Sequence, residues 1–213
     1  MMLKEKIWIA LLAVSVILVV CAGYSSHFPG DVSIALFVQR IASPAPEWAN
    51  WITATAKFPW NLVILCITVL LSWRVSGWRA ALLALACFAG MWVVGKGLGP
   101  LIARPRPSPD LIHVAKNLSG YSFPSGFALT YASTIGFLAV LFAQQTSGFL
   151  RAAAIAVCSA LLAIGWAARV ALGAHWPSDV ILSYLIGLLW ACFLVRFLKG
   201  GTAGAGGNDT NRT

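Results

Sequence analysis

Acidic side chains are scarce in this chain, which has six Asp and Glu against fifteen Lys and Arg in 213 residues. The six acids are spread along the whole sequence, as Glu5, Asp31, Glu47, Asp110, Asp179 and Asp209. Proteins bind Mg²⁺ and Ca²⁺ through several carboxylate and carbonyl oxygens, so this scarcity argues against a metal ion held by carboxylates.

Paired cysteines are also lacking. The five cysteines all lie inside apolar runs, and none has the spacing that is typical of a disulfide framework or of a zinc, haem or iron–sulfur site: Cys21, Cys66, Cys87, Cys158 and Cys192. A buried free cysteine behaves as a small hydrophobic residue. The sequence therefore predicts no metal and no other cofactor.

Charged residues of either sign make up only 10% of the chain, whereas 60% of the residues are hydrophobic. Soluble domains carry about 25% charged residues, and apolar runs of about 17–25 residues are long enough to cross a bilayer. The composition predicts an all-α, polytopic membrane protein. We expect six membrane-spanning helices, over Ile7–Tyr24, Phe58–Val75, Trp78–Leu98, Phe127–Gln144, Phe149–Leu172 and Pro177–Leu198. These form one domain over residues 1–199, and the Gly-rich tail 200–213 is expected to be disordered.

The first apolar run follows a charged start, as in a signal peptide. We interpret it as an uncleaved membrane helix, because further apolar runs follow and because Val20, rather than a small residue, precedes Cys21. After this helix, Val32–Ile41 is expected to form a short helix at the membrane surface. Tryptophans nearby are expected to anchor this region at the interface: Trp48, Trp51 and Trp60.

The formal net charge of +9 comes from Lys and Arg residues that stand singly at the ends of apolar runs. This placement is typical of membrane topology and of contact with the bilayer, not of nucleic-acid binding. More of these residues lie on the side of the N-terminus, so we expect both termini to be cytoplasmic. The loops after the first, third and fifth helices are then extracytoplasmic.

Three polar stretches are expected to meet on that outer face. They are Arg104–Pro107 after the third helix, Pro124–Gly126 before the fourth, and a segment between the fifth and sixth that holds Arg169, His175 and Asp179. Imidazole gains and loses a proton near neutral pH, and a neighbouring carboxylate can fix its tautomer. Guanidinium groups and the free amides of a helix start both bind phosphate.

Each stretch also has a purely structural interpretation. Ser125 is a good helix N-cap, and Arg104 and Arg106 can be cations at the membrane interface. Arg169 is harder to explain in this way, because an unpaired arginine at membrane depth is energetically unfavourable. Taken together, the stretches predict a phosphate pocket in which His175 is an exposed nucleophile.

The same stretches resemble the three motifs of the type 2 phosphatidic acid phosphatase/haloperoxidase superfamily, namely Lys-x6-Arg-Pro, Pro-Ser-Gly-His and Ser-Arg-x5-His-x3-Asp. The resemblance covers nearly the whole chain and implies a six-helix membrane lipid phosphatase. By this resemblance, His175 is the nucleophile that forms a phosphohistidine, and Asp179 is its orienting partner. The phosphoryl oxygens are then held by Arg169, by Arg106 or Arg104, by Ser125 and by the Gly126 amide.

The sequence departs from these motifs at three positions. Phe127 stands where the second motif has the histidine that protonates the leaving group, and Ala168 replaces the serine of the third motif. Gly99 occupies the position of the first-motif lysine. Lys96 precedes it by nearly one helical turn, and because a lysine side chain is long we expect Lys96 to reach the phosphate.

The missing acid bears on the substrate. General-acid catalysis is worth about 10²–10⁴ in rate, and it matters most when an alkoxide leaves, whose conjugate acid is about as weak as water with a pKa of ~15.7. It matters less when a phosphate monoester leaves, because its second pKa is about 6. Loss of the acid therefore favours a lipid diphosphate over a monoester such as phosphatidate. His113 is an alternative acid in the same outer loop.

Three functions remain in competition. The first is metal-independent hydrolysis of an isoprenoid, undecaprenyl-type diphosphate, with the phosphorylated lipid and the bilayer as partners. The second is a homologue that binds or translocates a phosphorylated lipid without cleaving it, which Phe127 and Gly99 favour. The third is a serine hydrolase using Ser125 and His175, and it is disfavoured because such an enzyme has no need of three arginines. The sequence leaves the lipid and the oligomeric state open.

Overall fold

The computed structural model describes residues 3–42, 47–116 and 118–198, and this part of the chain consists of helices and connecting loops without a strand. The all-α fold is therefore confirmed. Its helices, in chain order, are α1 (Leu3–Tyr24), α2 (Asp31–Ala42), α3 (Glu47–Ala54), α4 (Trp60–Ile102), α5 (Gly126–Tyr131), the π-helix η1 (Ala132–Gly136), α6 (Phe137–Gln145), α7 (Gly148–Ala171), α8 (Pro177–Val195) and the 3₁₀ turn η2 (Arg196–Leu198). The expected tail 200–213 lies outside the described residues.

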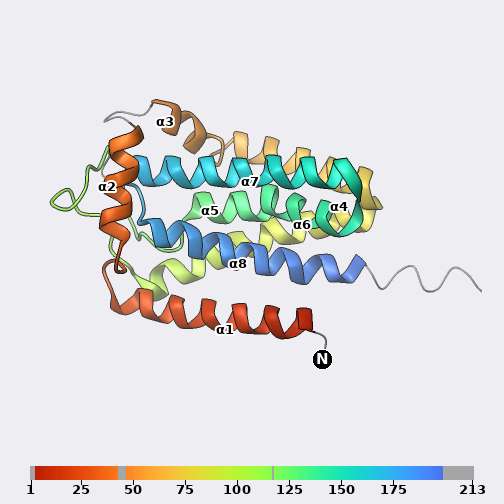
Figure 1. Ribbon diagram of the computed structural model, residues 1–213, viewed down its shortest axis with the longest axis horizontal. Coiled ribbons are helices and arrows are strands. Elements are labelled where there is room, and N and C mark those ends of the chain that lie inside the picture. The colour runs from red at the N-terminus through yellow and green to blue at the C-terminus, as the bar shows by residue number, and fades with distance from the viewer. Residues whose placement is uncertain (1–2, 43–46, 117, 199–213) are drawn as a thin grey trace, which may run out of the picture.

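Helix α4 consists of two limbs. Its 43 residues include two with non-helical backbone angles, Ser76 and Gly77, and Gly77 has a φ of +75° that favours glycine. Figure 1 shows the two limbs of α4 meeting at the right-hand end of the bundle, where the chain turns back. Within the described residues, five helical segments are long and apolar enough to cross a membrane when α4 is taken as one. The two limbs of α4 match two expected spans, and the count of six stays a prediction.

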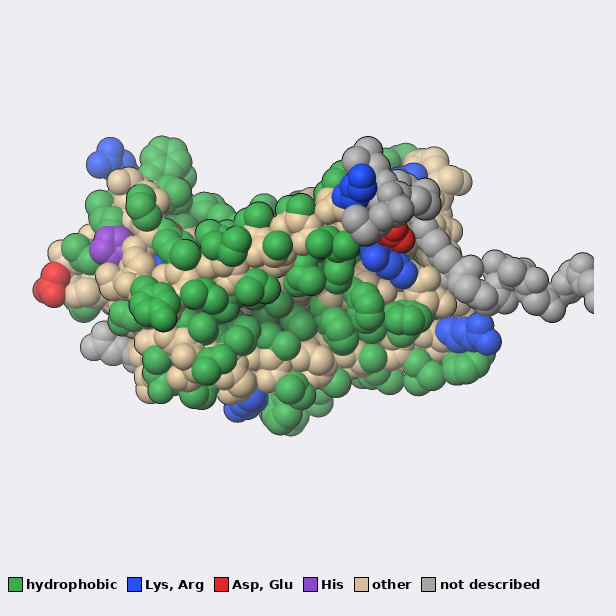
Figure 2. Space-filling model, turned by 90° about the horizontal axis from the view of Figure 1, so that it is seen from below, with side chains coloured by type: hydrophobic (Ala, Val, Ile, Leu, Met, Phe, Trp, Pro, Cys, Tyr) green, Lys and Arg blue, Asp and Glu red, His purple; other side chains and the backbone are tan. Residues whose placement is uncertain are grey.

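The loops that carry the polar motifs gather at one end of the bundle. Figure 1 shows α2, α3 and the loop between α4 and α5 at this end, and the start of α1 and the end of α8 at the other. Figure 2 shows one face of the molecule, on which hydrophobic side chains cover most of the surface between the two ends. Helix α2 matches the predicted surface helix, whereas α3 was not predicted. Trp51 is 76% exposed, and Trp48 and Trp60 are exposed as well, as expected for interfacial side chains.

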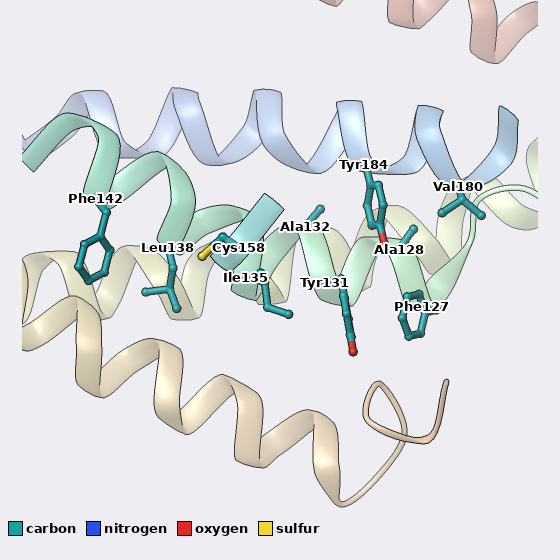
Figure 3. Packing of buried hydrophobic residues seen from close by; sticks show 10 residues of the cluster. All are labelled: Phe127, Ala128, Tyr131, Ala132, Ile135, Leu138, Phe142, Cys158, Val180 and Tyr184. Atoms are coloured by element: carbon teal, nitrogen blue, oxygen red, sulfur yellow. The ribbon is translucent and has the colours of Figure 1, made fainter. Parts of the chain in front are cut away.

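The segment α5–η1–α6 forms the centre of the bundle. Residues of this segment make up most of the main buried cluster, which also receives Tyr184 and Val180 from α8 (Figure 3). The π-helix packs directly against α8: a Cβ on Gly187 would lie only 2.4 Å from the Cβ of Ala132. Small residues at this crossing allow the two helix backbones to approach closely. Helix α5 thereby begins beside the start of α8.

Candidate active site

His175 lies in the loop between α7 and α8 with its side chain enclosed. Only 3% of the residue is exposed, so the prediction of an exposed histidine is wrong. Its Nδ1 lies 2.6 Å from the carbonyl oxygen of Ser122. A carbonyl can only accept a hydrogen bond, so the proton belongs on Nδ1 and the lone pair on Nε2. No residue that the structure describes hydrogen-bonds to Nε2, which leaves this atom as the nucleophilic one.

Asp179 is not in direct hydrogen-bond contact with His175, which corrects its predicted role as the immediate orienting partner. Its Oδ1 accepts a hydrogen bond from Nη1 of Arg104, and its Oδ2 accepts from the hydroxyl of Ser122 and from the backbone N–H of Trp176. The carboxylate therefore reaches the imidazole through Ser122, whose hydroxyl binds Asp179 and whose carbonyl binds His175.

Arg104 is part of the scaffold and does not line a phosphate cradle. The residue is 1% exposed, and it forms ion pairs with Asp179 and, at 3.4 Å, with Asp31. Its Nε donates to the carbonyl oxygen of Ser25 at 3.1 Å, and its guanidinium carbon lies 4.5 Å from the centre of the Phe28 ring. Because two buried carboxylates already satisfy this cation, the assignment of Arg104 to the phosphate is corrected in favour of Arg106.

Arg106 and Arg169 have no such partners. Arg169 is 6% exposed, its Nη1 donates to the hydroxyl of Thr53 at 3.2 Å, and its Nε is buried without a hydrogen bond. Arg106 is half-buried and donates to the carbonyl oxygens of Ala174, at 2.7 Å, and Ser119, at 3.3 Å. Within the described residues neither guanidinium forms an ion pair with a carboxylate. Two enclosed cations without counter-ions form a site that is complementary to an anion.

Burial and the two guanidinium groups together keep His175 neutral. Its pKa lies well below the ordinary value, first because the ring is buried and then because of the positive charges of Arg169 and Arg106, against which the Ser122 carbonyl acts weakly. Burial also lowers the pKa of Arg106, and the charge of Asp179 opposes this shift. The imidazole is therefore neutral at pH 7, as a nucleophile must be.

Ser125 occupies the N-cap position, as its structural interpretation predicts. Its hydroxyl accepts a hydrogen bond from the backbone N–H of Ala128 at 3.4 Å, and its own N–H donates to the hydroxyl of Ser183 at 3.0 Å. These contacts fix the start of α5 on α8. Gly126 is exposed beside it and lines a cavity of about 370 Å³ together with Lys96. The structure thus brings Lys96 and Gly126 together, in a cavity whose lining residues do not include His175.

Phe127 is a buried member of the main core cluster. Its ring centre lies 4.2 Å from that of Tyr131 and 5.6 Å from the guanidinium carbon of Arg169 (Figure 3). A Cβ on Gly165 would lie 2.8 Å from the Phe127 ring, so the glycine makes room for it. Of the other departures, Ala168 is fully buried, and a Cβ on Gly99 would lie 3.6 Å from Tyr121.

The sequence analysis did not assign Ser122, Asp31 or Ser178 to the site, although all three take part in this network. Nothing in the sequence distinguishes Ser122 from other loop serines. Asp31 could have been singled out from the sequence, because carboxylates are rare in this chain and a basic partner could have been sought for each of them. The alternative acid His113 is exposed, and the contacts that involve it run through its backbone, to Gln39. In the described part of the chain no three His, Cys, Asp or Glu side chains lie close enough to hold a metal ion.

Comparison with known proteins relates the chain to one family. The model of the PAP2 superfamily matches residues 78–202. A phosphatidylglycerophosphatase B of Haemophilus influenzae is 37% identical over 93 residues, which are 42% of this chain and 37% of that protein, so the match spans little more than a third of the relative. The crystal structure of a transmembrane PAP2 type phosphatidylglycerolphosphate phosphatase from Bacillus subtilis is similar in fold, with a TM-score of 0.69 at 22% identity over 93% of this chain and 98% of that one.

Proposed function

Since the chain belongs to the PAP2 superfamily, we propose that it is a membrane lipid phosphatase that works through a phosphohistidine at His175. The observation that carries the proposal is the pair of guanidinium groups, Arg106 and Arg169. Among the described residues neither has a carboxylate partner, and both lower the pKa of the His175 imidazole. Such a site binds the oxygens of a phosphoryl group and presents a nucleophile to its phosphorus.

The reaction follows from the hydrogen bonds of the site. Nε2 of His175 forms a bond to phosphorus, while the bond between phosphorus and the leaving oxygen breaks and its electron pair departs with that oxygen. The proton stays on Nδ1, which donates it in a hydrogen bond to the Ser122 carbonyl oxygen, and Asp179 stabilises the new positive charge through Ser122. The arginines stabilise the equatorial oxygens. Water then attacks phosphorus and loses a proton to solvent. The bond between phosphorus and Nε2 breaks, its electron pair returns to Nε2, and phosphate leaves with His175 neutral again.

We propose a lipid diphosphate of the isoprenoid, undecaprenyl type as the substrate. Phe127 contributes no proton to a leaving group, and a departing lipid monophosphate has little need of one. Lys96 supports this substrate, because it supplies a positive charge to the cavity that Gly126 also lines. A leaving phosphate in this cavity is stabilised by the lysine in place of protonation.

Two alternatives have observations in their favour. The relatives in the comparison are named for a lipid phosphate monoester, phosphatidylglycerophosphate, which favours a monoester substrate. The buried Phe127, where the family motif has an acid, favours a homologue that binds or translocates a phosphorylated lipid without turnover.

Phosphate release from a panel of lipids distinguishes these functions. The purified chain in detergent is given isoprenoid diphosphates, isoprenoid monophosphates and phosphatidylglycerophosphate, with chelator present and His175→Ala as the control. We expect release from diphosphates at a rate at least about 10²-fold above that from monoesters, the lower bound of general-acid catalysis. A preference for the monoester contradicts the diphosphate proposal, and binding of all three without release supports the binding homologue.

We further propose that the site faces the extracytoplasmic side. The loops of the site lie at the end of the bundle opposite to the start of α1 (Figure 1), and the distribution of Lys and Arg favours a cytoplasmic N-terminus. A substrate in the outer leaflet then reaches His175 with its phosphorylated end.

A further inference from the structure

Asp31 is a buried carboxylate surrounded by donors. It is the first residue of α2, in the segment between α1 and α4, and only 3% of it is exposed. Its Oδ1 accepts from the backbone N–H of Ser178 at 2.9 Å. Its Oδ2 accepts from the Ser178 hydroxyl at 2.7 Å, from the Phe28 N–H at 2.7 Å and from Arg104 at 3.4 Å. A buried carboxylate needs such partners, and this one finds two of them at the start of α8.

These contacts connect α2 to the nucleophile. Arg104 lies between Asp31 and Asp179, and its Nη1 also donates to the Ser178 hydroxyl at 3.1 Å. Asp179 in turn accepts from Ser122, whose carbonyl binds Nδ1 of His175. The chain of contacts therefore runs from Asp31 through Arg104, Asp179 and Ser122 to the imidazole, and the residues are joined by hydrogen bonds or ion pairs.

We propose that Asp31 is a positioning residue for His175, which acts by holding Arg104 and the first turn of α8 so that Asp179 stays on Ser122. This inference rests on the proposed function, since it assigns Asp31 to the nucleophile of that reaction. Asp31 lies outside residues 78–202, the part of the chain that the family model matches. The start of α2 thereby supports the catalytic centre from outside that part of the chain.

A carboxylate is required at this position because every neighbour is a donor. In Asp31→Asn the amide oxygen still accepts from the Ser178 N–H, but the amide NH₂ is turned toward the Phe28 N–H and the Arg104 guanidinium. Donors then face donors, and the buried cation loses one of its two counter-charges. Arg104 moves away from this position, and Asp179 and Ser122 no longer have one fixed arrangement. Arg106 and Arg169 make none of these contacts, so anion binding by the guanidinium pair remains.

Two anions separate positioning of the nucleophile from anion binding. Orthovanadate imitates the transferring phosphoryl group by bonding to the imidazole, whereas inorganic phosphate binds only the cations. Their affinities for the full chain in detergent are measured from the rise in the thermal unfolding midpoint. For Asp31→Asn we expect vanadate affinity to fall at least about tenfold, as for a misplaced reacting group, with phosphate affinity within about twofold of wild type. The control is Asp110→Asn, which removes a charge from an exposed loop position and is expected to leave both affinities unchanged.

Loss of both affinities together in Asp31→Asn, or no loss of either, overturns the proposal, because a merely structural role does not distinguish the two anions. Should Asp31→Asn fail to fold, Ser178→Ala removes only the hydroxyl contacts to Asp31 and Arg104. It is expected to lower the vanadate affinity alone by about threefold or more, and an unchanged ratio overturns the proposal. In the turnover assay we expect kcat to fall with KM nearly unchanged. A wild type that releases no phosphate contradicts the proposed function, while the anion comparison still decides the role of Asp31.

Discussion

The guanidinium carbon of Arg169 lies 5.6 Å from the centre of the Phe127 ring. Phe127 replaces the histidine of the family motif, so an aromatic ring contacts the arginine where relatives with the full motif have an acid. Cation–π contacts at this distance are attractive by about 0.5–2 kcal/mol. Arg169 also donates to the hydroxyl of Thr53, so these two contacts hold it without a carboxylate partner from the described residues. Phenylalanine at position 127 therefore supplies no proton, but it still helps to hold Arg169 in place for anion binding.

The two buried arginines are expected to respond to substitution in opposite ways. Arg104→Met breaks a buried ion pair and should lower the free energy of unfolding by about 3–5 kcal/mol. Arg169→Met removes an unpaired buried charge, so the unfolding midpoint should stay the same or rise, while turnover falls about 10²–10³-fold through loss of oxyanion stabilisation. Thermal unfolding and phosphate release measured on both variants test this. Equal loss of stability in the two variants would contradict the division between scaffold and cradle.

The pH dependence of kcat/KM should reflect the lowered pKa of His175. Because burial, Arg169 and Arg106 push this pKa well below 6.5, the free enzyme keeps its neutral nucleophile as the pH falls through 6.5. We expect kcat/KM, corrected for the ionisation of the substrate, to show no inflexion near pH 6.5 and to decline only at lower pH.

The free energy of unfolding should also depend on pH through His175, and it should fall as the pH falls. Below about pH 6.5 the unfolded chain binds a proton at His175 that the folded protein excludes, so stability decreases as the pH falls from 6.5 toward the folded pKa. In His175→Asn this part of the pH dependence should disappear. An inflexion of kcat/KM at 6.5, or an identical stability profile in the variant, would show that His175 titrates as an exposed histidine.

Sequence patterns predicted the helices well and the contacts of the site less well. Apolar runs mark membrane helices directly, and α7 and α8 begin within one residue of the predicted positions. The cluster of Arg106, Arg169 and His175 followed from motif spacing. Arg104 was indistinguishable from Arg106 in the sequence, because both precede a proline. Only the three-dimensional positions of Asp179 and Asp31 separate their roles. Burial of His175 likewise depends on how the loops pack, which local patterns do not encode.

The orientation of the site can be tested with single cysteines. After removal of the native cysteines, Ser108→Cys places a thiol in the loop between α4 and α5, and Ser76→Cys places one at the turn between the two limbs of α4. We expect a membrane-impermeant thiol reagent to label Ser108→Cys in intact cells and Ser76→Cys only after permeabilisation. The reverse pattern would put the site on the cytoplasmic face. In that case the substrate would come from the inner leaflet.

Phe127→His tests whether the missing acid determines the substrate. If the chain is a diphosphatase, a histidine beside Arg169 should supply a proton to an alkoxide leaving group and raise the rate on lipid monophosphates by about 10²–10⁴-fold, with little change for diphosphates. If Phe127 is only a core residue, the imidazole of the variant is buried among Tyr131 and Tyr184 without a hydrogen-bond partner. The variant then loses roughly 1–3 kcal/mol of stability and gains no activity.

The matched control for this variant is Phe127→Leu, which keeps an apolar side chain in the same core position but carries no proton. It should lose stability to a similar degree and leave the ratio of monophosphate to diphosphate turnover unchanged. A rise in that ratio in Phe127→His alone assigns the effect to the proton donor, because the loss of packing is common to both variants. An equal ratio in both would mean that the proton for a leaving group is not supplied from the start of α5, and the preference for a diphosphate would lose its physical basis.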